Sequence, residues 1–234
     1  MFDDQYLYLW IDFFTIIFPL IFSFLPLKSP FHKNWKAILI SIFLPAALFL
    51  VWDSTFTHWG IWGFNPRYVL GIFYMKLPVE EFLWFICIPY ACVFSYEAVN
   101  YYIKKDIIGG KSQIISSVLV GVLLAFGLLN YQKLYTVITF VSLAVFITWI
   151  QWFLKPKFIG NFYITFLFLL IPFFIVNGIL TGTGIEEPVV WYNNNENLSI
   201  RMGTIPIEDT FYGMLLILMN IALYEKFKSR STIA

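Results

Sequence analysis

Long apolar stretches, separated by short polar segments, run through the whole chain. A helix needs about 20 mostly apolar residues to cross the roughly 30 Å hydrocarbon core of a bilayer. Runs of about this length predict seven transmembrane helices, of which the second is the shortest. The predicted helices span residues 6–25, 36–52, 78–98, 113–129, 134–154, 161–180 and 206–225. The pattern therefore predicts an all-α membrane protein.

The composition agrees with this fold class and argues against a soluble domain. Hydrophobic residues make up 60% of the chain and charged residues 12%, with a mean hydropathy of +0.77. The first run follows Asp3 and Asp4 and lacks a basic segment and a small-residue cleavage site, so we expect a retained helix rather than a signal peptide. The net charge of +1 gives no indication of nucleic-acid binding. We expect one integral membrane domain, residues 1–234, surrounded by lipid.

Lysine and arginine residues are unevenly divided between the two sets of loops. Arg67, Lys76, Lys133 and Arg201 lie on one side. The other eleven of the fifteen lie on the opposite side: Lys28, Lys33, Lys36, Lys104, Lys105, Lys111, Lys155, Lys157, Lys226, Lys228 and Arg230. Because cytoplasmic loops carry the excess of basic residues, we predict a protein of the cytoplasmic membrane with its N-terminus outside and its C-terminus in the cytoplasm.

One acidic signature occurs twice, each time at the start of an apolar run. The sequence LPVEE at residues 77–81 recurs as IPIED at residues 205–209, 128 residues later. The same ungapped offset superimposes Asn65 on Asn193, Leu70 on Leu198, and Tyr96-Glu97 on Tyr224-Glu225. The offset predicts two three-helix repeats, residues 1–105 and 134–234, joined by a linking helix within 106–133. Because one unmatched helix separates them, both repeats cross the membrane in the same direction.

The two acidic doublets, Glu80-Glu81 and Glu208-Asp209, are the main candidates for catalytic residues. Acids after a proline are also an ordinary helix start, since they interact favourably with the helix dipole. A helix start does not account for two consecutive acids in both copies, and ionisable residues of membrane helices usually face the bundle interior. We expect each doublet to share one proton, with Glu80 and Glu208 as the acids, and both doublets to serve one apolar cavity.

Two further acids have no acidic counterpart 128 residues later. Asp53, at the outer end of the second helix, corresponds to Thr181 and is a candidate for orienting the first doublet. Asp12, within the first helix, corresponds to Phe140. Either acid can be a site residue present in one half only or a structural residue, and the asymmetry leaves open whether both halves are fully catalytic.

Helical spacing places apolar and aromatic side chains in line with each doublet. Such stripes are more often packing surface, but together with buried acids they would suit a long nonpolar substrate. The candidates for lining that substrate are Trp84, Phe94, Phe211 and Tyr212. Asn65 and Asn193, in corresponding outer loops, are expected to form turns or to brace the loop over the acids. Glu97 and Glu225, at the other ends of their helices, are expected to form ion pairs with the nearby lysines.

These features resemble the membrane-integral lycopene cyclase domain, found as small paired subunits of bacterial carotenoid cyclases and as the fused cyclase region of bifunctional fungal enzymes. The resemblance rests on PVEE at residues 78–81, on PIED at residues 206–209, on their place at the start of the third helix of each repeat, and on the chain length. It implies a non-redox, proton-initiated ring closure at the ends of lycopene or a related linear carotenoid. The reaction class would be that of an intramolecular lyase or isomerase, with the doublets as acid and base.

The resemblance implies no flavin, and the sequence predicts no cofactor and no metal. Gly182-Thr183-Gly184 lacks the third glycine and the strand-helix context of a dinucleotide fingerprint. His32 and His58 lie in loops on opposite sides of the predicted bundle, which argues against a shared metal site. Cys87 and Cys92, five residues apart on one helix, are not expected to form a disulfide.

Three other classes of protein compete with the cyclase. A proton-coupled carrier would also use paired carboxylates in parallel repeats, and prolines interrupt several helices as they do in carriers. A carotenoid end-group hydratase would begin with the same protonation but would admit water. A retinal photoreceptor is disfavoured because the seventh helix contains no lysine before Lys226. The ring type, the number of ends closed and the oligomeric state are left open by the sequence.

Overall fold

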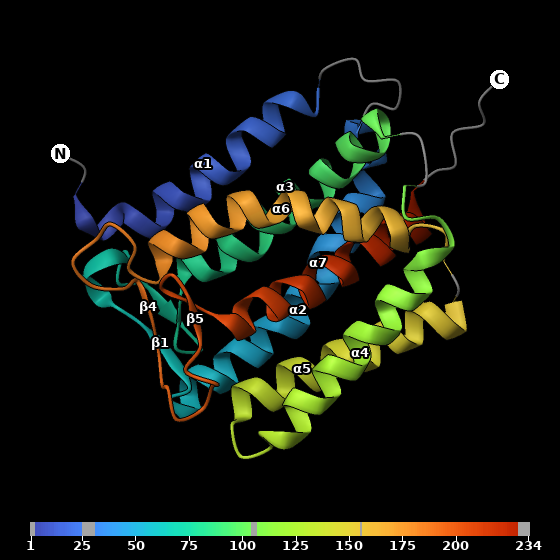
Figure 1. Cartoon of the computed structure of the whole chain (residues 1–234). Coiled ribbons are helices and arrows are strands. Elements are labelled where there is room, and N and C mark those ends of the chain that lie inside the picture. Colours follow the sequence, from blue (N-terminus) through green and yellow to red (C-terminus); the bar gives the residue numbers. More distant parts are fainter. Residues whose placement is uncertain (1–2, 25–30, 104–106, 155, 229–234) are drawn as a thin grey trace. The chain divides into compact units, whose positions relative to one another are not determined.

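A computed structural model describes residues 3–24, 31–103, 107–154 and 156–228, and in these segments seven helices are long and apolar enough to cross a membrane. The prediction of seven spans in an all-α membrane protein is confirmed (Figure 1). The helices are α1 (Leu7–Phe22), α2 (Trp35–Trp59), α3 (Val79–Tyr102), α4 (Ser112–Leu129), α5 (Leu134–Thr148), α6 (Ile159–Leu180) and α7 (Ile207–Phe227). The predicted end of the first helix, residue 25, lies outside the described residues. So do Lys28, Lys104, Lys105, Lys155 and Arg230.

The prediction that the second helix is the shortest is wrong. With the short 3-10 helix η2 (Phe31–Asn34), α2 forms a continuous helical span of 29 residues, the longest of the seven. The apolar run ends at Trp52, but the helix continues through polar residues whose side chains find partners. Asp53 is buried in contact with Glu81, the Ser54 hydroxyl donates to the Met75 carbonyl, and the Thr55 hydroxyl donates back to Val51.

Short strands and turns lie in the two connections that precede the acidic helices, between α2 and α3 and between α6 and α7. The strands are β1 (Trp62–Phe64), β2 (Phe73–Tyr74), β3 (Leu77–Pro78), β4 (Val190–Tyr192), β5 (Arg201–Met202) and β6 (Ile205–Pro206). They form three two-stranded sheets, β1-β4, β2-β3 and β5-β6. The remaining helical turns are η1 (Asp4–Tyr6), η3 (Pro66–Tyr68), η4 (Gly109–Lys111) and the π-helical η5 (Trp149–Leu154).

Two antiparallel hairpins lead directly into α3 and α7. Hairpin β2-β3 pairs Tyr74 with Leu77, and hairpin β5-β6 pairs Met202 with Ile205. Met75 has a φ of 52° and the residue after it one of 64°, as the tight turns of two-residue hairpins require. In the second hairpin the corresponding first turn position is Gly203, which adopts its φ of 66° without steric cost. The hairpins therefore fix where each acidic helix begins.

The chain divides into two compact units. The first comprises Met1–His58, Phe64–Lys104 and Leu216–Ala234, and the second Trp59–Gly63 and Lys105–Leu215. This division differs from the predicted repeats, because the second half of α7 belongs to the first unit. The predicted boundary between residues 105 and 106 lies outside the described residues.

In the first unit, α1 packs along α3. The buried residues of α1 are Tyr8, Ile11 and Asp12, which lie on one helix face. An exposed ion pair between Asp4 and Arg67, 2.6 Å long, joins η1 to η3 above these helices. The other face of α1 exposes large apolar side chains, as expected for a helix in contact with lipid.

In the second unit, α4 and α5 form a closely packed antiparallel pair (Figure 1). Gly127 allows this approach, because a Cβ at its position would lie 3.3 Å from the Cβ of Phe140. Ser116 on α4 is buried and hydrogen-bonded to Gln151 on η5 and to the Tyr163 hydroxyl on α6. Large apolar side chains are exposed on α4, α5 and α6 as well. Both units thus have the exterior of an integral membrane protein.

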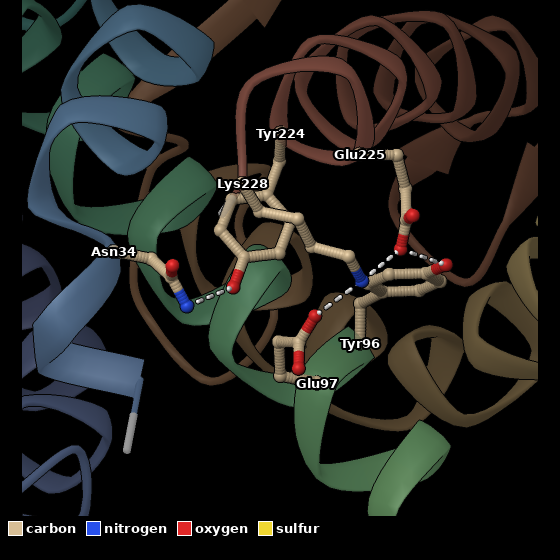
Figure 2. A network of polar contacts seen from close by, with 6 residues as sticks. All are labelled: Asn34, Tyr96, Glu97, Tyr224, Glu225 and Lys228. Atoms are coloured by element: carbon tan, nitrogen blue, oxygen red, sulfur yellow. Dashed lines mark hydrogen bonds and ion pairs between the residues drawn. The ribbon is translucent and has the colours of Figure 1, made fainter. Parts of the chain in front are cut away.

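A polar cluster, which we term the tyrosine–glutamate cluster, lies in the first unit at the C-terminal ends of α3 and α7 (Figure 2). It consists of Asn34, Tyr96, Glu97, Tyr224, Glu225 and Lys228. The Lys228 ammonium group lies 3.0 Å from Glu97 and 2.5 Å from Glu225, and the Tyr96 hydroxyl donates to Glu225. The expected ion pairing of Glu97 and Glu225 is confirmed, with one lysine serving both. The cluster ties α3 to the end of α7.

The contribution of Lys228 to the stability of the first unit should be lost at alkaline pH. Burial alone would lower the pKa of Lys228, but the negative charge of Glu97 and the bonds to Glu225 outweigh it and raise this pKa above the ordinary 10.5. A group with a raised folded-state pKa stabilises fully below its unfolded pKa and loses this contribution as the pH rises through the folded value. We expect Lys228→Met to lower the free energy of unfolding by about 2 kcal/mol at pH 7.

Thermal unfolding in detergent at pH 7 and above pH 11 measures this effect. The difference between wild type and Lys228→Met should be largest at pH 7 and should shrink at the alkaline pH. Lys226→Met, two residues earlier and exposed, is the matched control and should leave the unfolding temperature unchanged. Equal effects of the two substitutions at pH 7 would contradict the role assigned to the Lys228 ion pairs.

Candidate active site

Glu80 is completely buried at the first turn of α3, and its two carboxyl oxygens have different surroundings. Hairpin β2-β3 and Pro78, which is extended at the helix N-cap, set its position. Its Oε1 accepts a hydrogen bond of 2.7 Å from the backbone N–H of Leu70. Its Oε2 is buried without a hydrogen-bond partner among the described residues. One oxygen is thus anchored to the loop before the hairpin, and the other is available to a bound molecule.

Glu81, the next residue, is held by different partners. The Tyr8 hydroxyl on α1 donates to Glu81 Oε2 over 2.6 Å. The side chain of Asp53 on α2 forms a second hydrogen bond with Glu81. Two carboxyl groups can be hydrogen-bonded to each other only when one of them carries a proton. Glu81 and Asp53 therefore hold at least one proton between them, and the prediction that Asp53 orients the first doublet agrees with this contact.

Glu208 repeats the geometry of Glu80 in the second unit. It is completely buried at the start of α7, and its Oε1 accepts 2.7 Å from the backbone N–H of Leu198. The Thr136 hydroxyl on α5 donates to the same oxygen over 2.6 Å. Oε2 of Glu208, like Oε2 of Glu80, is buried without a hydrogen-bond partner in the described part of the chain.

Asp209 is surrounded by hydroxyl donors and aromatic rings. Tyr135 donates to one carboxyl oxygen over 2.5 Å, and Tyr192 donates to the other over 2.8 Å. The two phenol rings are stacked with centroids 6.0 Å apart, and the ring of Trp62 meets both edge to face. Arg201 lies over the Tyr192 ring and within electrostatic range of Asp209. Both oxygens of the Asp209 carboxyl group are thus held by tyrosine hydroxyl groups.

The two members of each doublet have different hydrogen-bond partners. Consecutive helical residues point about 100° apart, and the first acid of each doublet accepts a loop N–H while the second accepts from tyrosine hydroxyl groups. In the first unit the contact between carboxyl groups runs from Glu81 to Asp53. In the second unit Asp209 bonds tyrosines instead. Each doublet thus combines one acid that has an unpartnered oxygen with one acid that is held by tyrosine hydroxyl groups.

The two substrate-lining candidates on α3 lie at different distances from Glu80 along the helix. Trp84 is buried one turn after Glu80, and its indole N–H has no partner among the described residues. Phe94 lies 14 residues after Glu80, about 21 Å along the helix, and packs edge to face on Phe31. Phe94 therefore cannot touch a ring that Glu80 protonates.

In the second unit, Phe211 and Tyr212 contact other aromatic side chains. Phe211 meets Phe140 edge to face at 4.9 Å. Tyr212 is buried and contacts the rings of Trp62 and Tyr135, so it belongs to the aromatic surroundings of Asp209.

Asn65 and Asn193 shape turns and do not touch the acids. The side-chain oxygen of Asn65 accepts from the N–H of Arg67, and that of Asn193 accepts from the N–H of Asn195. Both asparagines thus form turns, which is one of the two roles expected for them. The bracing of the loop over the acids comes instead from the backbone N–H groups of Leu70 and Leu198.

Sequence reasoning did not find the hydroxyl groups that hold the acids. These are Tyr8, Tyr135, Thr136 and Tyr192. With 14 tyrosines in the chain, residue type alone does not select them. The 128-residue offset contains one usable signal, because it superimposes Tyr8 on Thr136 and both carry a hydroxyl group.

The described residues contain no group of three or more His, Cys, Asp or Glu side chains that could hold a metal ion. Cys87 and Cys92 are both free and buried, as expected. What the site provides is carboxyl and hydroxyl groups in an apolar surrounding. This arrangement is suited to moving protons to and from a nonpolar molecule.

The fold and the site together define an integral membrane protein with buried carboxyl groups arranged for acid–base chemistry. The family model described as lycopene cyclase matches residues 5–99 and again residues 132–227, which is most of the chain. The chain belongs to the lycopene cyclase family.

A curated relative agrees with this family. A bifunctional lycopene cyclase/phytoene synthase of Phycomyces blakesleeanus is 40% identical over 65 residues. The matched segment is 27% of this chain and 11% of that relative, so the similarity spans a small part of the fungal protein. No solved structure matches the chain.

Proposed function

We propose that this protein is a lycopene cyclase that closes rings at the ends of a linear carotenoid by proton transfer alone. The observation that carries the proposal is the unpartnered, buried Oε2 of Glu80 and of Glu208, each beside an acid held by hydroxyl groups. Membership of the family supports the choice of substrate.

The different surroundings of the acids suggest a role for each. Glu80 and Glu208 act as proton donors, because the backbone N–H bonded to Oε1 stabilises the carboxylate that remains after the proton has left Oε2. Glu81 and Asp209 act as bases, because tyrosine hydroxyl groups hold each of them in place beside the proton donor. An acid and a base with distinct surroundings are what a two-step proton transfer needs.

The reaction is balanced without a redox partner. The proton of Glu80 Oε2 adds to the terminal carbon–carbon double bond, which leaves a tertiary carbocation. The neighbouring double bond supplies the electron pair for the new carbon–carbon bond, and the cation moves into the ring. Glu81 then removes one ring proton, and a new double bond forms. The product is an isomer of the substrate, so the enzyme would be an intramolecular lyase or isomerase that needs no flavin.

Aromatic side chains near the acids support a cationic intermediate. Trp84 lies one turn from Glu80, and Tyr212 packs with Trp62 and Tyr135 near Asp209. Aromatic faces attract a positive charge, most strongly where water is excluded. Water would also capture the cation as an alcohol, so the burial of the acids favours ring closure over hydration.

We further propose two tandem repeats, 1–105 and 134–234, in a protein of the cytoplasmic membrane with its N-terminus outside. Contacts within the two units recur at the 128-residue offset, as in the bonds from Leu70 to Glu80 and from Leu198 to Glu208. The two segments matched by the family model, 5–99 and 132–227, also support the repeat. The distribution of lysine and arginine supports the orientation.

Conversion of lycopene in vesicles tests the function. Purified protein in phosphatidylcholine vesicles loaded with lycopene should form a cyclic isomer with no flavin or nicotinamide nucleotide added, and chromatography with mass detection identifies it. A product one water heavier would support the hydratase, and proton flux across the vesicle membrane with unchanged lycopene would support the carrier. Either result, with verified incorporation of the protein, would overturn the cyclase proposal.

A further inference from the structure

Asp12 is a buried acid that the proposed acid–base steps do not use. It lies on α1, one turn after Tyr8 on the face that packs against α3. Only 2% of its surface is exposed, and neither carboxyl oxygen has a hydrogen-bond partner among the described residues. An unpartnered buried carboxylate would be very costly, whereas a neutral carboxylic acid is tolerated. The carboxyl group of Asp12 is therefore neutral in the resting site.

The neighbours of Asp12 are the two acids of the first doublet. Its carboxyl group lies within electrostatic range of Glu80, of Glu81 and of Cys87, all on α3. Because no hydrogen bond fixes its orientation, the carboxyl group can turn towards either acid. A neutral carboxylic acid has one oxygen that accepts a proton and one O–H that gives a proton.

Proton balance shows what such a group can do. After one ring closure by the proposed function, Glu80 has lost a proton and Glu81 has gained one. The next turnover cannot begin until a proton has returned to Glu80. Glu80 and Glu81 do not hydrogen-bond each other, since their bonds run to Leu70 and to Tyr8. Glu81 also bonds Asp53. In a site closed to water, a group within electrostatic range of both Glu80 and Glu81 can complete the return.

We propose that Asp12 is a proton-relay residue that resets the first site after each ring closure. One oxygen of Asp12 accepts the proton that Glu81 took from the ring, and the other oxygen passes its own proton to the Glu80 carboxylate. Glu81 is again ionised, Glu80 is again protonated, and Asp12 stays neutral, so no net charge or proton is gained. This inference rests on the proposed function and adds a reaction step to it.

The second unit does not share this relay. The position that corresponds to Asp12 is Phe140, which packs edge to face on Phe211 at 4.9 Å. The position that corresponds to Asp53 is Thr181, whose hydroxyl bonds Thr204 and the backbone of its own helix. Among the described residues, the first unit thus has four buried acidic side chains where the second has two, and repeated turnover through Asp12 belongs to the first unit.

Single and multiple turnover separate the relay from the chemical step. We would measure Asp12→Asn in lycopene vesicles, once with protein in large excess and once with lycopene in large excess. With protein in excess, the variant should convert lycopene like wild type, since no reset is needed. With lycopene in excess, ring formation should stall after about one ring at each acidic doublet, and the steady rate should fall by about 100-fold. Asp12→Glu, which keeps a carboxyl group, should restore turnover.

A control variant and two contrary outcomes separate a relay role of Asp12 from a purely structural role. Thr15→Val, on the same helix with its hydroxyl bonded to Ile11, should behave like wild type in both arms. Wild-type turnover by Asp12→Asn would overturn the relay, and so would failure with protein in excess while thermal stability is unchanged. If wild type forms no rings in either arm, the cyclase proposal itself fails.

Solvent deuterium provides a measurement on wild type that does not depend on a folded variant. In heavy water with lycopene in excess, an internal return of protons should give products with less than one deuterium per ring, because protons taken from earlier substrate molecules are used again. One deuterium in every ring would mean that Glu80 is reloaded from solvent, and this result would overturn the relay.

Discussion

Ring formation by the double variant Glu80→Gln, Glu208→Gln is expected to fall by about 100-fold or more, the usual contribution of a general acid. Glutamine has the shape of glutamate, and its oxygen can still accept the N–H bonds of Leu70 and Leu198. The substitution therefore removes the transferable proton while it keeps the loops in place. The measurement is the initial rate of cyclic product in lycopene vesicles, at equal amounts of folded protein.

The single variants and a matched control sharpen this prediction. Glu80→Gln alone should cost more activity than Glu208→Gln alone, because Asp12 and Asp53 accompany only the first doublet. Glu186→Gln makes the same chemical change on an exposed loop and should leave the rate unchanged. If the double variant keeps wild-type activity, Glu80 and Glu208 are not the proton donors, although the chain remains a member of its family.

Trp62→Ala is expected to destabilise the second unit by about 3–5 kcal/mol, the range measured for large aromatic residues removed from protein cores. Trp62 is only 4% exposed, and its ring contacts Tyr135, Tyr192 and Tyr212. Tyr135 and Tyr192 in turn hold Asp209. The loss of Trp62 should therefore lower both the unfolding temperature and the activity that depends on Asp209.

Trp59→Ala is the matched control for this prediction. Trp59 precedes Trp62 by three residues and is 58% exposed, so its removal leaves no cavity. We expect its unfolding temperature in detergent to stay close to that of wild type. Similar losses for the two variants would show that the packing around Asp209 does not stabilise the second unit in the way inferred.

The seven membrane spans could be predicted from the sequence because apolar length alone determines them. The extent of α2 could not, because Asp53 ends the apolar run but not the helix. Its burial depends on Glu81, which is far away in the sequence and close in space. A polar residue can extend a buried helix when a distant partner satisfies it, and that partner is not visible in local hydropathy.

The acidic doublets could be found from the sequence, but their surroundings could not. The repeated signature pointed to Glu80 and Glu208, and the structure adds that each has one anchored and one unpartnered oxygen. The hydroxyl groups of Tyr8 and Tyr135 come from other helices, and helix packing decides which tyrosines reach an acid. Adjacency in the sequence predicts a shared proton within each doublet but does not show that the two acids of a doublet bond different partners.

The backbone N–H of Leu70 makes the loop before the first hairpin sensitive to the charge on Glu80. A hydrogen bond to an ionised carboxylate is shorter and stronger than one to a neutral acid. Each time Glu80 gives up its proton, this loop should stiffen, and it should loosen when the proton returns. The loop would then be held most firmly during the lifetime of the carbocation. Hydrogen exchange of the Leu70 amide should be slower when Glu80 is ionised than when it is protonated.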